Sequence, residues 1–93
     1  MSEDRTIWHV YMVRCSDGTL YTGIAKDLEK RIAAHNSGKD GARYTRSRRP
    51  VTLVYAAQVE SRSAAARLEY QLKRLTPAKK NGLIEESGVK SKG

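Results

Sequence analysis

The chain has 93 residues, 39% hydrophobic and 30% charged, proportions typical of one folded domain and unlike those of disordered or fibrous proteins. One cysteine and two histidines exclude an internal disulfide and a four-ligand zinc site, and no apolar run is long enough to span a membrane. Eighteen Lys and Arg residues against ten Asp and Glu give a net charge of +8, which favours a polyanionic partner.

The first element is expected to be a β-hairpin. Residues 7–15 are rich in β-branched and aromatic side chains at both odd and even positions, which predicts a strand covered on both faces. Residues 19–24 form the second strand. A two-residue turn between the strands would place Tyr11 and Tyr21 on opposite faces, and a three-residue turn would place them on the same face. Gly18, at the third turn position, favours the second arrangement.

A helix is expected next. Asp27 is a good N-cap, and the helical pattern runs through Leu28 and His35 until residues 36–38 end it. Residues 36–50 then show no apolar periodicity. A stretch of that length in so small a domain is usually functional or disordered.

The remaining elements are a third strand and two helices. Residues 51–59 are mostly apolar and predict the strand. Ser61 can cap a helix, and Thr76 followed by Pro77 begins another. The first of these helices has an apolar stripe formed by Ala65, Leu68, Leu72 and Leu75. The predicted fold class is therefore α+β, a small three-stranded antiparallel sheet flanked by helices in the order β-β-α-β-α-α.

The whole chain is expected to be a single domain. We predict a unit over residues 1–93, with a core at about 7–84 and a frayed tail at 87–93. The first four residues lack the basic and then apolar start of a secretory signal, so the protein is expected to be cytoplasmic.

The positive charge is concentrated in two segments, residues 39–49 and 73–80. Two basic segments on an otherwise neutral body predict nucleic acid, rather than a membrane, as the partner. The alternative is solvated charge that only aids solubility. The candidate nucleic-acid-binding residues are Lys39, Arg43, Arg46, Arg48, Arg49, Lys73, Lys79 and Lys80.

Three charged or titratable side chains lie at or near predicted buried faces. Glu69 falls about 40° from Ala65 on the second helix, at the margin of its apolar stripe. A carboxylate there needs a cationic partner, either a metal ion or an arginine in a salt bridge. Arg31 and His35 share one face of the first helix, where Arg31 could bind phosphate and His35 could carry a proton. Alternatively, both could be edge residues whose stems are buried and whose polar ends remain in water.

Together these residues resemble the GIY-YIG nuclease domain, and in particular its short stand-alone bacterial members, the YhbQ-like group. The first motif reads His9-Val10-Tyr11 and the second reads Tyr21-Thr22-Gly23. The resemblance spans about residues 7–84 and continues with Leu28, Arg31, His35 and Glu69. The departures are the loss of glycine from the first motif and Thr22 in place of isoleucine in the second.

The resemblance implies a set of site residues. Glu69 would be the sole protein ligand of one divalent metal, Mg²⁺ or Mn²⁺. Arg31 would hold the scissile phosphate, and Tyr11 and Tyr21 would line the site, with one of them orienting or deprotonating the attacking water. His35 would share the proton transfer. Gly23 would let the backbone pass close to the substrate or the helix, and Tyr44 matches a loop tyrosine of some relatives.

The resemblance also implies a function, a metal-dependent DNA endonuclease that hydrolyses phosphodiester bonds. Because no recognition helix is predicted, selectivity should come from the shape of branched, nicked or flapped DNA, or from a targeting protein. Some larger relatives act in DNA repair, and RNA as a further partner stays open. The alternatives are a non-catalytic basic module of the same fold that binds nucleic acid, and a small ribosome-associated or scaffold protein.

Overall fold

The computed structural model describes residues 7–37, 45 and 47–87. Its strands are β1 (Trp8–Arg14), β2 (Leu20–Ala25) and β3 (Thr52–Val59), and its helices are α1 (Leu28–Ser37), α3 (Arg62–Lys73) and α4 (Pro77–Ser87). The element order confirms the predicted α+β fold. Ser87 belongs to α4 rather than to a tail, and the rest of the predicted tail, 88–93, lies outside the described residues. No helix in the described ranges is long and apolar enough to cross a membrane.

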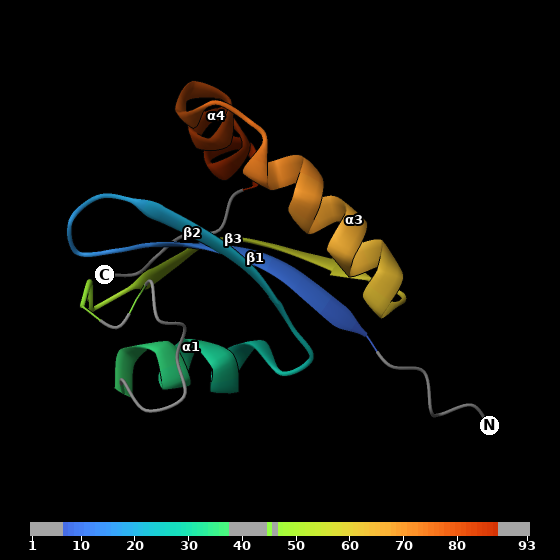
Figure 1. Ribbon diagram of the computed structural model, residues 1–93, viewed down its shortest axis with the longest axis horizontal. Coiled ribbons are helices and arrows are strands. Elements are labelled where there is room, and N and C mark those ends of the chain that lie inside the picture. Colours follow the sequence, from blue (N-terminus) through green and yellow to red (C-terminus); the bar gives the residue numbers. More distant parts are fainter. Residues whose placement is uncertain (1–6, 38–44, 46, 88–93) are drawn as a thin grey trace.

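The three strands form an antiparallel sheet in the order β2-β1-β3, so β1 is central and β2 lies at an edge. Helix α1 covers one face, and α3 and α4 cover the other (Figure 1). Each face has its own apolar cluster. Tyr11 and Val13 belong to the cluster under α1, whereas Val10 and Leu72 belong to the cluster under α3 and α4. Strand β1 is thus buried on both faces, as its continuous apolar sequence predicted.

The turn of the β-hairpin fixes which face the tyrosines occupy. Val13 pairs with Tyr21, and Gly18 has a φ of +89°, so the three-residue turn is confirmed. Tyr11 lies in the buried cluster under α1, and Tyr21 packs against the same cluster. In this register the two phenols share a face of the sheet. A register shifted by one residue would have placed them on opposite faces.

Side-chain caps set where the helices begin. The Asp27 Oδ1 atom accepts a hydrogen bond from the Lys30 backbone N–H at 3.1 Å, at the start of α1. The Ser61 hydroxyl accepts one from the Ala64 N–H at 3.1 Å, at the start of α3. In α4 the Thr76 hydroxyl accepts one from the Lys79 N–H at 3.2 Å. Each cap satisfies a donor that has no partner within its helix, as predicted for all three positions.

Candidate active site

The candidate site is centred on the hydroxyl of Tyr11, in the central strand. Tyr11 is 1% exposed, and its oxygen lies 2.8 Å from Nε2 of His35 on α1. Tyr11 pairs across the hairpin with Gly23 of β2. A Cβ atom built on Gly23 would lie 2.6 Å from the Tyr11 oxygen and 3.2 Å from Cε2 of Tyr21. Gly23 is therefore the position at which the backbone of β2 approaches both phenols, which gives the predicted glycine a physical reason.

His35 is a buried link between Tyr11 and the segment before β3. Both His35 and Thr45 are 0% exposed, and Nδ1 of His35 lies 2.8 Å from the Thr45 hydroxyl. The rings of Tyr11 and Tyr21 meet the imidazole edge-on, with centroids 5.9 Å and 5.4 Å away. Sequence reasoning missed Thr45, because it lies in a stretch without periodicity and nothing marks it as buried.

The protonation of His35 follows from its surroundings. Burial lowers the pKa of His35, and the nearby positive charge of Arg31 lowers it further. A neutral imidazole has one N–H and one acceptor nitrogen. Arg31 is a hydrogen-bond partner of the Tyr11 phenol. All three contacts are satisfied when Arg31 donates to the Tyr11 oxygen, Tyr11 donates to Nε2, and Nδ1–H donates to Thr45.

Burial and three neighbouring side chains set the pKa of Tyr11. Burial raises the pKa of Tyr11 above 10.0, and the hydrogen bond and positive charge of Arg31 offset part of that rise. The charges of Tyr21 and Glu69 add to the increase in the pKa. The phenol is therefore protonated at neutral pH. Arg31, Tyr21 and Glu69 are thus the side chains whose charge affects the Tyr11 hydroxyl.

Glu69 reaches this region from the opposite face of the sheet. It lies on α3, which packs against β2 and β1, whereas Arg31 lies on α1. The Glu69 side chain is 25% exposed, and its carboxylate lies 3.3 Å from the ammonium of Lys73. The ion pair predicted as one alternative for Glu69 therefore exists, with a lysine on the same helix rather than an arginine.

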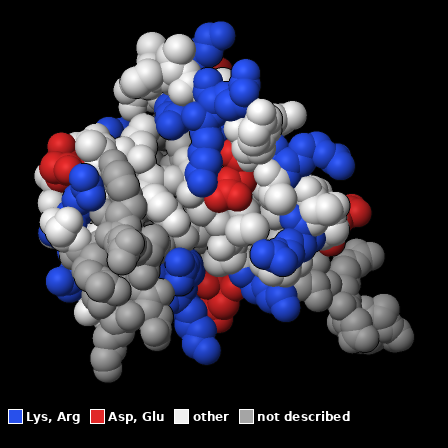
Figure 2. Space-filling model, viewed as in Figure 1, with Lys and Arg blue, Asp and Glu red and all other residues white. Residues whose placement is uncertain are grey.

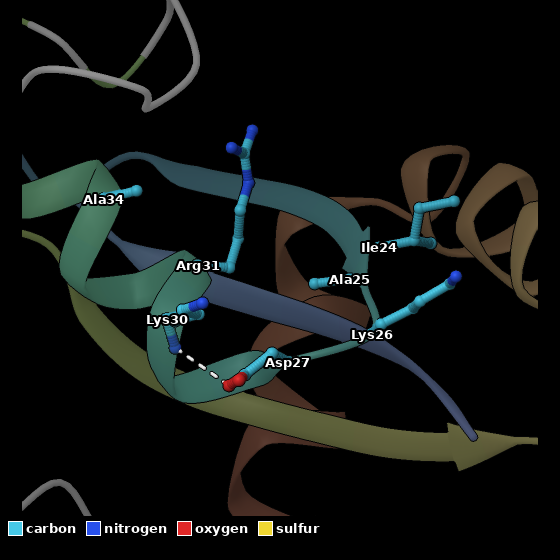
Figure 3. Close-up of a pocket in the computed structure, with 7 residues that line it drawn as sticks. All are labelled: Ile24, Ala25, Lys26, Asp27, Lys30, Arg31 and Ala34. Atoms are coloured by element: carbon cyan, nitrogen blue, oxygen red, sulfur yellow. Dashed lines mark hydrogen bonds between the residues drawn. The ribbon is translucent and has the colours of Figure 1, made fainter. Parts of the chain in front are cut away.

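A basic groove of about 550 Å³ lies between α1 and the end of β2, and Arg31, which also affects the pKa of Tyr11, lines it. Arg31 extends from α1 past β2, and Lys26 extends from the end of β2 (Figure 3). The groove is lined by Ile24, Ala25, Lys26, Asp27, Lys30, Arg31 and Ala34. Three of these side chains are cations, and the one carboxylate, Asp27, caps α1. Lys26 and Lys30 were missed by sequence reasoning, although their position beside Arg31 was a usable signal.

The donor set near Glu69 fits a divalent metal that takes few protein ligands. Among the described residues there is no group of three or more His, Cys, Asp or Glu side chains that could hold an ion. One partly exposed carboxylate suits Mg²⁺ or Mn²⁺, which keep water and substrate phosphate oxygens as their other ligands. Lys73 would have to leave the carboxylate for an ion to bind there.

Several predicted nucleic-acid-binding residues lie away from the groove or have other partners. Arg48 forms an ion pair with Asp17 at 3.0 Å, and Arg49 donates to the Asn36 carbonyl at 3.3 Å. Lys79 and Lys80 belong to α4, which contributes no residue to the groove lining. On the face seen in Figure 2, Lys and Arg side chains surround smaller acidic groups. The predictions for Lys39, Arg43, Tyr44 and Arg46 fall outside the described residues.

The buried imidazole should make stability depend on pH. The pKa of His35 is below its ordinary 6.5 in the folded protein, so the unfolded chain binds a proton more readily below pH 6.5. The free energy of unfolding should therefore not depend on His35 above pH 6.5. Below pH 6.5 it should decrease as the pH falls, by at most about 1.4 kcal/mol per pH unit. Urea titrations at several pH values measure this slope. A His35→Gln variant that kept the same slope would contradict the assignment.

Comparison with known sequences gives one family model and a group of similar proteins. Residues 7–81 match the family model described as the GIY-YIG catalytic domain. A UPF0213 protein of Desulfotalea psychrophila is 54% identical over 84 residues, which cover 90% of this chain and 76% of the relative. A UPF0213 protein of Halobacterium salinarum is 52% identical over 76 residues, which cover 82% of this chain and 97% of the relative.

Solved structures with similar folds lead to the same group. The solution structure of a UPF0213 protein from Bacillus halodurans has a TM-score of 0.57 and 43% identity, covering 88% of this chain and 86% of that chain. The solution structure of an E. faecalis protein has a TM-score of 0.60 and 33% identity, covering 98% of this chain and 97% of that chain. The chain therefore belongs to the GIY-YIG family of nuclease domains and is similar to UPF0213 proteins over most of its length.

Proposed function

We propose that this protein is a divalent-metal-dependent endonuclease that hydrolyses phosphodiester bonds in DNA. Family membership indicates a nuclease, a hydrolase whose substrate is nucleic acid. The observation that carries the finer proposal is that Tyr11 and Tyr21 meet at His35 of α1, the helix whose Arg31 lines a groove with two lysines, while the Glu69 carboxylate contributes to the raised pKa of Tyr11. A guanidinium, two phenols and a carboxylate are the groups that phosphodiester hydrolysis needs for substrate binding, water positioning and metal binding.

Each side chain has a role that its surroundings support. In hydrolysis a water oxygen attacks phosphorus, the bond to the leaving oxygen breaks, and that oxygen takes up a proton. Arg31 lines the groove and can bind two phosphate oxygens while negative charge grows on them. Tyr21 is half-buried, so its hydroxyl is the one able to meet the attacking water. The Tyr11 hydroxyl is buried and held by His35, which makes Tyr11 and His35 positioning residues in this proposal.

Glu69 is the residue that would hold the metal ion. A bound divalent ion polarises phosphate oxygens and makes a bound water more acidic. Lys73, which pairs with Glu69, would then be available to the phosphate backbone, as its position in the second basic segment predicted.

The proposed selectivity is for DNA shape rather than sequence. The groove presents cations from α1 and from the end of β2, and such side chains contact phosphates rather than base edges. Branched, nicked or flapped DNA would expose a strand to the groove more readily than an intact duplex does. A role in DNA repair, a targeting protein, a cytoplasmic location and binding to RNA stay predictions.

A non-catalytic nucleic-acid-binding module is the second candidate function. The ion pair between Glu69 and Lys73 favours it, because this contact gives the carboxylate a structural partner without any metal. A pure binding module, however, has no use for a carboxylate that pairs with the basic side chain of Lys73, since the acid weakens phosphate binding there.

Cleavage assays with an Arg31 variant test the proposed function. Single-stranded, nicked, flapped and branched DNA would be incubated with Mg²⁺ or Mn²⁺ and resolved on denaturing gels. Arg31→Gln should lower the cleavage rate by about 10²–10³-fold, because it removes the guanidinium that can bind two phosphate oxygens in the groove. Lys30→Gln removes a neighbouring charge from the same groove and should cost only a few-fold. Absence of cleavage of every substrate by the wild-type protein would leave the binding module as the function.

A further inference from the structure

Beside the groove, two cations gather on one aromatic ring. The Lys26 ammonium lies 5.2 Å from the centroid of the Trp8 ring, and the Arg62 guanidinium carbon lies 5.8 Å from it. Both distances are within the range of cation–π attraction. The three residues come from three elements, the start of β1, the end of β2 and the start of α3. We call this set, Trp8, Lys26 and Arg62, the tryptophan cluster.

The two cations of the tryptophan cluster have no acidic partner in the part of the chain that the structure describes. The ion pairs found there join Arg48 to Asp17 and Lys73 to Glu69. Two like charges that both lie near one ring and have no carboxylate partner repel each other, and the indole ring offsets only part of that repulsion. An anion placed between Lys26 and Arg62 would remove the repulsion.

The tryptophan cluster is continuous with the candidate active site. Lys26 both lines the groove and lies over Trp8, so one side chain belongs to both. Ile24 also lines the groove, while its side chain packs in the apolar cluster that contains Trp8. At about 100° per residue, Arg62 projects from the same margin of α3 as Glu69, about 20° apart around the helix. A strand seated in the groove would therefore extend onto the cluster.

We propose that the tryptophan cluster binds the sugar–phosphate backbone of the DNA strand next to the bond that is cut, with Trp8 holding Lys26 and Arg62 around a phosphate. The cluster thus extends the substrate site of the nuclease function proposed above, on which it depends. Lys26 and Arg62 supply the charge. Trp8 is a positioning residue that keeps the two cations together.

Equilibrium binding in EDTA, where a metal-dependent nuclease would not cut, tests the cluster without catalysis. Fluorescence anisotropy would follow a labelled nicked DNA duplex over a series of salt concentrations. Lys26→Gln and Arg62→Gln should each weaken binding about five- to tenfold near 0.1 M salt. Each should also lower the slope of log K against log salt by about 0.9, the loss of one phosphate contact. Trp8→Phe keeps an aromatic ring that fills the core but attracts cations less strongly. It should weaken binding two- to threefold with little change in slope.

The matched control is Arg67→Gln. Arg67 lies on the same helix as Arg62 and carries the same charge, but it is exposed and about 160° from Ala65, on the outer face of α3. Its replacement should leave the affinity and the slope nearly unchanged. Trp8 is the chain's sole tryptophan, so its emission should change when DNA binds, and the change should be smaller for Arg62→Gln at the same subsaturating DNA concentration.

The outcomes separate this inference from the proposed function. If Lys26→Gln and Arg62→Gln bind DNA with the affinity and salt slope of wild type and of Arg67→Gln, while wild type still cleaves DNA, the cluster is not a phosphate site and the nuclease proposal stands. If Trp8→Phe abolishes binding while Lys26→Gln and Arg62→Gln do not, the ring stacks on bases and the phosphate assignment is wrong. If wild type shows neither salt-dependent DNA binding nor cleavage, the proposed function fails and the cluster assignment fails with it.

Discussion

Glu69→Gln should abolish metal-dependent DNA cleavage, with a fall in rate of at least about 10³-fold. Glutamine keeps the size of the side chain but lacks the negative charge that a divalent ion needs. The fold should tolerate the change, because the ion pair with Lys73 is partly exposed and contributes at most about 1 kcal/mol. Binding of DNA in EDTA should be unchanged or tighter, because one negative charge has been removed and Lys73 has lost its acidic partner.

Two measurements make the Glu69→Gln result specific. Electron paramagnetic resonance measures the binding of Mn²⁺ to the protein without DNA. This binding should be lost together with cleavage. Glu85→Gln removes an exposed carboxylate from α4 and serves as the matched control, with cleavage and Mn²⁺ binding both retained. If Glu69→Gln cuts DNA as fast as wild type, the activity comes from a contaminant or from another site, and the role assigned to Glu69 is wrong.

Gly23→Ala should have the largest effect on stability for the smallest chemical change. The new methyl carbon would lie 2.6 Å from the oxygen and 2.8 Å from Cζ of Tyr11, a ring that is 1% exposed and has no room to shift. Such overpacking costs about 1–3 kcal/mol, or roughly 4–24 °C in melting temperature for a domain of this size. Because the Tyr11 hydroxyl would also be displaced from His35, DNA cleavage should fall even at temperatures where the variant is folded.

Gly82→Ala provides the control for this substitution. Gly82 lies in α4, and a Cβ atom there meets no atom within 4 Å. Alanine should therefore stabilise the helix by about 0.5–1 kcal/mol and leave cleavage unchanged. Thermal melts followed by circular dichroism measure both variants. Equal melting temperatures for Gly23→Ala and wild type would show that β2 does not approach Tyr11 as closely as the structure indicates.

Local signals in the sequence were sufficient to predict the fold. The caps at Asp27, Ser61 and Thr76 and the turn at Gly18 each depend on a few neighbouring residues, and all four were confirmed. The shared face of Tyr11 and Tyr21 followed from the turn length alone, because side chains alternate along a strand.

The tertiary contacts of the candidate site could not be predicted in the same way. The bond between His35 and Thr45 joins α1 to a segment without periodicity, and no residue pattern signals such a partner. The tryptophan cluster joins three elements that become neighbours only when the hairpin has formed and α3 packs on the sheet. The pairing of Glu69 with Lys73 was within reach of sequence reasoning, because residues four apart on a helix are neighbours.

The two layers of helices that flank the sheet have a consequence for the nascent chain. Arg31 comes from the layer below the sheet and Glu69 from the layer above it, with β3 between them in the sequence (Figure 1). A ribosome must therefore release most of the polypeptide before the two halves can meet. During synthesis, the proposed active site would therefore form only when α3 docks on the sheet.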